Sequence, residues 1–132
     1  MKARFENIEI EAKFTGGKAA PWGGDRENYN YHVVSVQNVD TGAKAKFDFW
    51  ASLAHPIIDS EPEVLSAFYC FVSDAITGLY SFEEFCGELG YDTDSRKAEK
   101  IYKACQRAAT EAEQVIGGDL YDFANRLQEI AG

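Results

Sequence analysis

The stretch AKFDFWASLAHPIIDSEPEVLSAFYCFVSDA, residues 45–75, contains the change of hydrophobic period that decides the fold. In residues 45–51, alanine and phenylalanine occupy every second position, which is typical of a half-buried β-strand. After Ser60 the apolar residues recur every three or four positions as far as Ala75, which is typical of an amphipathic α-helix. The sequence therefore predicts strands before Ser60 and helices after it.

The residues before Ser60 predict a three-stranded antiparallel sheet within residues 8–52. The expected strands either alternate apolar with polar residues or are rich in tyrosine and valine. The Asp-Thr-Gly sequence at residues 40–42 is a turn signal between the second and third strands. Residues 15–25 are dense in glycine and predict a loop. The expected strands are residues 8–14, 29–39 and 45–51.

About four helices are expected after Ser60, because capping signals and glycine stops divide the helical pattern. A serine followed three residues later by a glutamate forms a capping box at Ser60 and again at Ser81. The third helix is the longest by pattern, and Asp92, Asp94 or Ser95 caps it. The expected stops are Gly78, Gly90 and Gly117, and Asp119 caps the last helix.

These elements predict a single α+β domain over residues 1–132, with a β-rich half, residues 1–58, and a helical half, residues 59–132, packed on the sheet. A chain of 132 residues has the usual length of one domain and can bury a core without disulfides. No apolar run approaches the ~18 residues that cross a bilayer, and charged residues begin at Lys2. We therefore expect a cytoplasmic protein with no signal peptide and no membrane partner.

The three cysteines, Cys70, Cys86 and Cys105, are an odd number without paired spacing. Each lies within an apolar helical pattern, where free cysteine is usually buried and unreactive. No cysteine or histidine stands two to four residues from another, as a zinc knuckle would require. We therefore expect three reduced and largely buried thiols.

Asp92 and Asp94 lie between two expected helices, where a pair of acidic residues suggests a calcium loop. An EF-hand loop beginning at Asp92 would need glycine at its sixth position and glutamate at its twelfth, but Lys97 and Lys103 occupy them. Carboxylates immediately before a long helix are explained by capping and by the helix dipole. We therefore expect no metal and no cofactor.

His32 and His55 are the only histidines that a usual acid-base or nucleophilic mechanism could recruit. The sequence contains no nucleophile elbow, no phosphate-binding glycine loop and no H-E-x-x-H motif. We therefore expect no catalytic residues and no enzymatic activity. One alternative stays open, a small enzyme or ligand-binding module that uses the region of Trp22, Trp50 and His55.

The net charge of −9 is unevenly distributed along the chain. Residues 1–58 hold seven basic and seven acidic residues, so the whole excess lies in residues 59–132. Residues 59–94 contain nine acidic residues and no lysine or arginine. An acidic field attracts a basic partner and disfavours direct binding of nucleic acid. A basic cluster then follows, consisting of Arg96, Lys97, Lys100, Lys103 and Arg107.

The segment from Phe82 to Ala98, with Tyr102 and Cys105 beyond it, carries the pattern FxxFCxxxGYDxDSxKA. This pattern resembles a recurrent signature of small uncharacterised proteins from bacteriophages and prophages. Residues 47–52, FDFWAS, resemble the strand that precedes the helices in those proteins. The resemblance covers most of residues 29–105 and brings no established catalytic residue. Because phage accessory genes often encode proteins that disarm host defences, it implies a non-enzymatic inhibitor of the anti-CRISPR type.

Our functional hypothesis is a phage or prophage accessory protein in the cytoplasm of the host bacterium that binds and inhibits a host defence protein. Its acidic helical face would occupy a basic surface that otherwise holds nucleic acid, since complementary charge speeds and aligns association. A phage assembly or replication accessory protein is a further alternative, and a homodimer stays open. The expected partner-binding residues are acidic residues off the apolar stripes: Glu61, Glu63, Glu83, Glu84 and Glu88.

Overall fold

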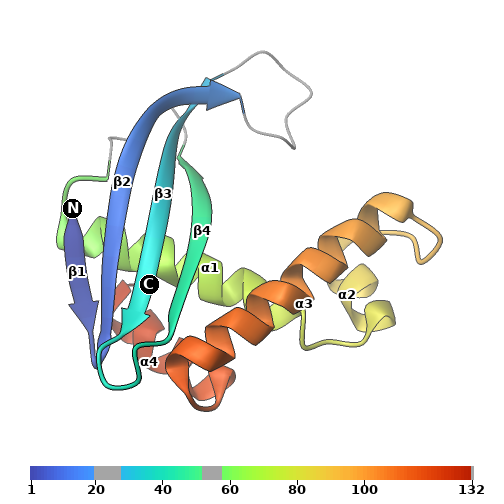
Figure 1. Ribbon diagram of the computed structural model, residues 1–132. Helices are drawn as coiled ribbons and strands as arrows, with labels where there is room; N and C mark the ends of the chain where they lie inside the picture. Colours follow the sequence, from blue (N-terminus) through green and yellow to red (C-terminus); the bar gives the residue numbers. More distant parts are fainter. Residues whose placement is uncertain (20–27, 52–57, 132) are drawn as a thin grey trace.

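Four antiparallel strands form one sheet in the N-terminal half of the chain (Figure 1). The computed structural model describes residues 1–19, 28–51 and 58–131. The strands lie in the order β1-β2-β3-β4, so each strand pairs with the next one in the sequence. They are β1 (Lys2–Phe5), β2 (Ile8–Ala19), β3 (Asn28–Asn38) and β4 (Lys44–Ala51).

The expected number of three strands is wrong, because β1 adds a fourth strand at the edge beside β2. β1 has only four residues, of which Ala3 and Phe5 are buried. Two apolar residues are too few to establish a period of two in the sequence. A tight turn with φ of 53° at Glu6 pairs Phe5 with Ile8 and places both side chains in the core.

β2 is longer than predicted, because it extends through residues 15–19, which we expected to form a loop. The pairing of β2 with β3 shifts between Phe14 and Gly16, as at a β-bulge. Gly16 has a φ of 109°, which glycine adopts without strain. This glycine therefore marks a bulge inside a strand. The rest of the expected loop, residues 20–25 with Trp22, lies outside the described residues.

The two faces of β4 carry different side chains, as predicted. Phe47 and Phe49 pack against the buried core. Trp50 lies instead beside Tyr31 of β3, with the ring centroids 4.8 Å apart. Because successive side chains of a strand point to opposite faces, one face of the sheet belongs to the core and the other carries Tyr31 and Trp50.

Four helices follow the strands, so the fold is α+β as predicted. Figure 1 shows α1 crossing one face of the sheet with α4 beside it, while α3 passes the β4 side and projects beyond the sheet. Within the described residues, no helix combines the length and the apolar character needed to span a membrane. The helices are α1 (Glu61–Thr77), α2 (Phe82–Leu89), α3 (Arg96–Ile116) and α4 (Leu120–Ala131).

The predicted caps are confirmed for three of these helices. At α2, the Ser81 hydroxyl accepts a hydrogen bond from the Glu84 amide, and the Glu84 carboxylate accepts one from the Ser81 amide. At α3, Ser95 is the cap, because its hydroxyl accepts a hydrogen bond from the Ala98 amide at 3.1 Å. At α4, the Asp119 carboxylate accepts hydrogen bonds from two amides of the first turn.

The capping box expected at Ser60 is wrong. Ser60 precedes α1 in an extended conformation, but its side chain makes no capping hydrogen bond. The Glu63 carboxylate instead accepts a hydrogen bond from the Asp59 amide at 3.3 Å. Pro62 lies in the first turn and has no N–H group, so this helix start presents one donor fewer to a cap.

Ser95→Ala should lower the free energy of unfolding by about 1 kcal/mol, because the Ala98 amide loses its acceptor. Asp94→Ala should change it by less than about 0.5 kcal/mol, because Asp94 is exposed and accepts from no amide of α3. Millimolar calcium or magnesium should leave the melting temperature of the wild type unchanged. Urea and thermal unfolding of the three proteins measure these differences. A larger loss in Asp94→Ala would contradict the assignment of the cap.

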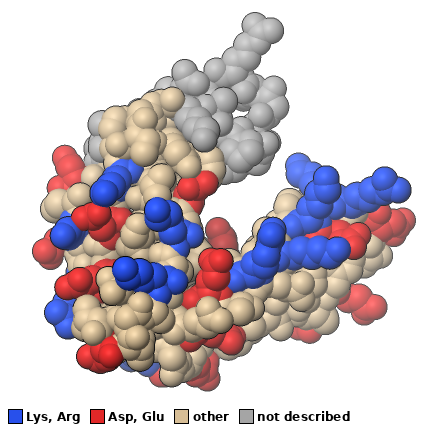
Figure 2. Space-filling model, in the orientation of Figure 1, with Lys and Arg blue, Asp and Glu red and all other residues tan. Residues whose placement is uncertain are grey.

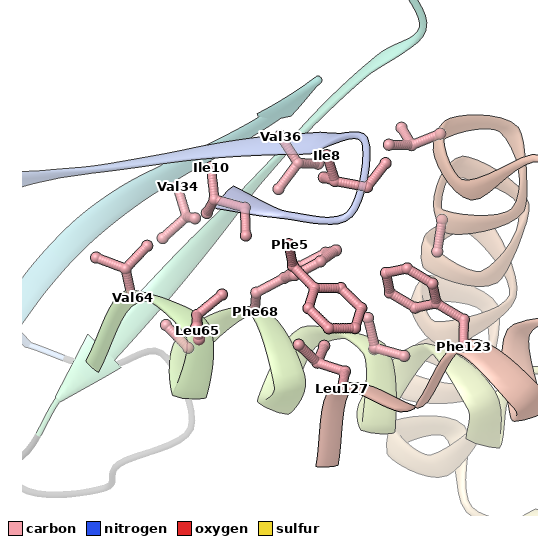
Figure 3. Packing of buried hydrophobic residues seen from close by; sticks show 14 of the residues in the cluster. Phe5, Ile8, Ile10, Val34, Val36, Val64, Leu65, Phe68, Phe123 and Leu127 are labelled. Carbon is pink, nitrogen blue, oxygen red and sulfur yellow. The ribbon is translucent and has the colours of Figure 1, made fainter. Parts of the chain in front are cut away.

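The main core lies between the sheet and helices α1, α3 and α4 (Figure 3). The ring of Phe123 meets Phe5 edge-on at 5.3 Å and Phe68 at 5.8 Å between centroids. Burial of this apolar surface is the dominant favourable contribution to folding. The residues labelled in Figure 3 are Phe5, Ile8, Ile10, Val34 and Val36 from the sheet, Val64, Leu65 and Phe68 from α1, and Phe123 and Leu127 from α4.

A second, smaller hydrophobic cluster holds α2 against the projecting part of α3. The Phe85 ring lies 5.0 Å from the Tyr102 ring and stacks on Tyr91 at 6.2 Å. Tyr91 therefore packs back on α2 after the chain turns, as expected for this helix ending. We call α2 together with residues 96–107 of α3 the arm. The buried residues of the cluster are Phe85, Cys86 and Ala98.

The thiol prediction is confirmed for Cys86 and wrong for Cys70. All three cysteines are free thiols, but Cys70 is exposed, Cys105 is half-buried and only Cys86 is buried. On α1, Cys70 stands midway between the buried residues Phe68 and Val72. Two residues are about half a turn of an α-helix, so Cys70 faces away from the stripe that Phe68 and Val72 form.

Candidate partner-binding surfaces

The solvent face of α2 carries three of the five acidic residues predicted to bind a partner. Their side chains are exposed, on the side of α2 opposite to the cluster that packs on α3. The loop that follows α2 adds the exposed residues Asp92 and Asp94. Within the described residues, none of these carboxylates forms an ion pair with lysine or arginine. The three α2 residues are Glu83, Glu84 and Glu88.

The other two predicted residues, Glu61 and Glu63, lie elsewhere. Both are in the first turn of α1, whose 17 residues separate them from the start of α2. A helix of this length spans about 25 Å, at 1.5 Å per residue. The structure therefore brings Glu83, Glu84 and Glu88 together and leaves Glu61 and Glu63 at the far end of α1.

Tyr121, in the first turn of α4, is an aromatic residue close enough to Glu84 of α2 to feel its charge. Its side chain is 47% exposed. Desolvation raises the pKa of the Tyr121 hydroxyl, and the nearby groups of Tyr80, Glu84 and Asp119 raise it further. These groups come from two separate parts of the chain, residues 80–84 and Asp119. Leu79, next to Tyr80, is 40% exposed and adds apolar surface.

We call this region the acidic surface, and it includes three residues that the sequence did not single out, of which Tyr121 is the most exposed. Tyr121 lies off the apolar stripe of α4, which faces the core. In the sequence, a binding residue of this kind can be recognised as a large aromatic residue on the polar side of an amphipathic helix. Its proximity to Glu84 depends on how α4 packs and is not readable from α4 alone. The acidic surface consists of Glu83, Glu84, Glu88, Asp119, Leu79, Tyr80 and Tyr121.

The opposite side of the arm is basic. Four exposed cations recur on α3 at steps of four, three and four residues, which places them on one face of the helix. The residues of α3 that pack on α2, such as Ala98, lie about half a turn away from this face. Lys103 is paired with Glu99 at 3.3 Å between charged atoms. We call this face the cationic stripe, and it consists of Arg96, Lys100, Lys103 and Arg107.

Figure 2 shows basic side chains along the arm, bordering a hollow between the projecting part of α3 and the sheet. At the inner end of this region, Lys44 and Lys46 of β4 line one open depression together with Glu111 and Gln114 of α3. Glu9, Glu11 and Glu61 line the same depression, so the sheet side of this region carries mixed charge. The arm presents opposite charges on its two sides.

The region proposed for a ligand-binding module is described only in part. Trp22 and His55 lie outside the described residues. Trp50 lies beside Tyr31, and a hydrogen bond to Asp48 raises the pKa of the Tyr31 hydroxyl. Within the described ranges, no group of three or more histidine, cysteine, aspartate or glutamate side chains could hold a metal ion.

His32 is a fully buried histidine on the core face of β3. Its Nε2 atom accepts a hydrogen bond from the Ile58 amide at 3.3 Å, and its ring lies 5.4 Å from that of Phe14. Accepting this bond requires a neutral ring, and burial lowers the pKa of His32 below 6.5. His32 therefore joins β3 to the residue that directly precedes the helical half.

His32→Gln should remove part of the acid sensitivity of the fold. Below pH 6.5 the unfolded state protonates this histidine, but the folded state does not until a lower pH, so stability falls with pH in that interval. Glutamine keeps an acceptor for the Ile58 amide and does not titrate. Urea unfolding at pH 7.5, 6.5 and 5.5 should show a flatter profile in the variant. Identical profiles would contradict this role.

No protein-family model matches the chain, and searches of curated proteins and of solved structures also return no match. The resemblance to phage and prophage proteins therefore stays a prediction from the sequence pattern.

Proposed function

We propose that this chain is a non-enzymatic phage or prophage accessory protein that docks its acidic surface on a basic, nucleic-acid-binding surface of a host defence protein. The strongest support is that the acidic surface contains both of the kinds of side chain that an interface with a basic protein uses. Exposed carboxylates of α2 form no ion pair within the described residues, one of them, Glu84, lies near the exposed Tyr121, and Leu79 is exposed in the turn before α2. Together these groups supply the two components that a protein interface needs.

The carboxylates and the apolar side chains have different roles in such an interface. Glu83, Glu84 and Glu88 attract and orient a basic partner, which mainly raises the association rate. Tyr121 and Leu79 expose apolar surface that a partner would bury, and burying it mainly lowers the dissociation rate. Charge alone would give a weak, salt-sensitive encounter. The exposed apolar groups therefore favour the interpretation that this surface forms a specific complex, rather than only keeping the protein in solution.

Inhibition follows from competition for one surface. A defence protein that binds nucleic acid presents lysine and arginine side chains at the spacing of phosphates. Carboxylates held on the short rigid helix α2 can pair with the same side chains and exclude the nucleic acid. Glu61 and Glu63 lie too far from α2 to share a small contact with it, so the proposed interface centres on α2 and the start of α4.

Expression of the chain in bacteria that carry an active CRISPR system, followed by challenge with a targeted phage, tests this function. We expect the wild-type chain to restore plaque formation. The variant Glu83→Gln/Glu84→Gln/Glu88→Gln should lose this effect. The matched control Glu9→Gln/Glu61→Gln/Glu129→Gln makes the same change of charge outside the acidic surface and should keep it.

Binding of the purified chain to the purified effector complex completes the test. Tyr121→Ala should weaken this binding at least about tenfold, which corresponds to the loss expected at an interface anchor. Unchanged restriction across the CRISPR types tested would contradict the anti-defence role. Equal inhibition by the two triple variants would contradict the role of the acidic surface.

A further inference from the structure

The cationic stripe differs from the acidic surface in one respect besides charge. Large apolar side chains are exposed at Leu79, Leu89 and Tyr121, but none is exposed along the solvent face of residues 96–107. Interfaces between proteins are enriched in aromatic anchors and depleted in lysine at their centres. A surface of lysine and arginine without such anchors is better suited to phosphate groups, which are bound through charge.

The geometry of the stripe also suits a phosphate backbone. Arg96 and Arg107 are eleven residues apart on one straight face, a rise of about 16 Å. Bases in one strand of a duplex rise about 3.4 Å each, so the stripe follows roughly five nucleotides. The long side chains can adjust to the exact phosphate positions. The pair between Lys103 and Glu99 is an exposed i,i+4 contact, which is weak and easily exchanged.

We propose that the cationic stripe binds the phosphate backbone of a nucleic acid without reading its sequence. The bound strand lies along the projecting part of α3, beside the hollow in Figure 2. Beyond the inner end of the stripe, Lys44 and Lys46 of β4 lie among carboxylates, including Glu111, so the proposed binding surface is the stripe itself. The arm then holds two partners, a basic protein on its acidic surface and a nucleic acid on the opposite side.

The net charge of −9 does not prevent this binding, because the charges are separated in space. α2 carries its carboxylates on the side away from α3, and packed helices are about 8 to 10 Å apart between axes. The Debye length at physiological ionic strength is about 8 Å, so the carboxylates of α2 are screened from a strand on the stripe. The net charge lowers the affinity at low salt more than at physiological salt.

Fluorescence anisotropy with a labelled 20-base-pair DNA duplex and with single-stranded dT20 tests the proposal on the full chain. Both probes should bind at 25 mM NaCl, and duplexes of different sequence should bind equally. Four phosphate contacts predict a slope of log affinity against log salt of about −3.6 for the duplex, or a roughly 150-fold loss between 50 and 200 mM. Lys100→Gln/Arg107→Gln should reduce the slope by about 1.8.

Two further variants make the result specific. Lys2→Gln/Lys13→Gln removes two exposed cations from the sheet and should leave both affinity and slope unchanged. The triple glutamine variant of α2 should retain nucleic-acid binding, which separates this proposal from the function of the acidic surface. Circular dichroism checks that every variant is folded. Absence of binding at 25 mM NaCl, an equal loss in the sheet variant, or equal competition by polyglutamate would overturn the proposal.

Discussion

Gly78→Ala should destabilise the protein by about 3 kcal/mol, because it adds a methyl group where two helices meet. A Cβ atom at Gly78 would lie 2.3 Å from the carbonyl carbon and oxygen of Cys105 and 2.5 Å from the Gln106 nitrogen. These are backbone atoms of α3, so no change of rotamer relieves the clash. α1 and α3 would have to move apart, which disturbs both hydrophobic clusters.

The same substitution at Gly87 provides a matched control with the opposite sign. Gly87 lies inside α2, and among the described residues nothing outside that helix would lie within 4 Å of a Cβ atom there. Alanine at an exposed helical position should stabilise the protein by roughly 0.5 to 1 kcal/mol. Urea unfolding of the wild type and the two variants gives the comparison. A loss below about 1 kcal/mol in Gly78→Ala would contradict the close approach of α1 and α3.

Gly78 shows what a local pattern can and cannot predict. The sequence marks it correctly as the end of a helix, but Gly78 has a right-handed φ of −72°, unlike the left-handed Gly90 and Gly117. Its small size is required by Cys105, which is 27 residues away in the chain. Helix periods and three of the four expected caps are local and were therefore predictable, whereas the contact that fixes Gly78 depends on the packing of two helices.

The same distinction applies to the candidate surfaces. The positions of Glu83, Glu84 and Glu88 follow from the period of α2, so the sequence could place them on a solvent face. The grouping of Glu84 with Tyr121 depends on how α4 returns along α1, which no local pattern contains. Net charge was the least informative quantity, because it averages over two sides of the arm that carry opposite charges.

Asn38→Asp should destabilise the protein by about 3 kcal/mol at pH 7, although the two side chains have nearly the same shape. Asn38 is buried, and its Nδ2 atom donates to the Val115 carbonyl at 2.8 Å, in the last turn of α3. Its Oδ1 atom accepts hydrogen bonds from the Asp40 and Thr41 amides at 2.9 and 3.1 Å. This one side chain therefore joins the β3–β4 turn to the end of α3.

Aspartate keeps the acceptor of Asn38 but replaces the donor with a charged oxygen that faces the Val115 carbonyl at the negative end of a helix dipole. Burial and this repulsion raise the pKa of the new carboxyl above about 3.9, its value in the unfolded chain. A raised pKa makes the folded state bind the extra proton first, so the penalty should shrink as the pH falls from 7 toward 4. The protonated carboxyl can again donate to Val115.

Urea unfolding of Asn38→Asp and the wild type between pH 7 and pH 4 measures how this difference in stability changes. Asn125→Asp makes the same chemical change at an exposed position of α4 and should alter stability by less than about 0.5 kcal/mol at every pH. A loss in Asn38→Asp that stays constant across the pH range would show that a buried charge is not its cause. A loss close to zero at pH 7 would contradict the hydrogen bond by which Asn38 holds α3 to the sheet.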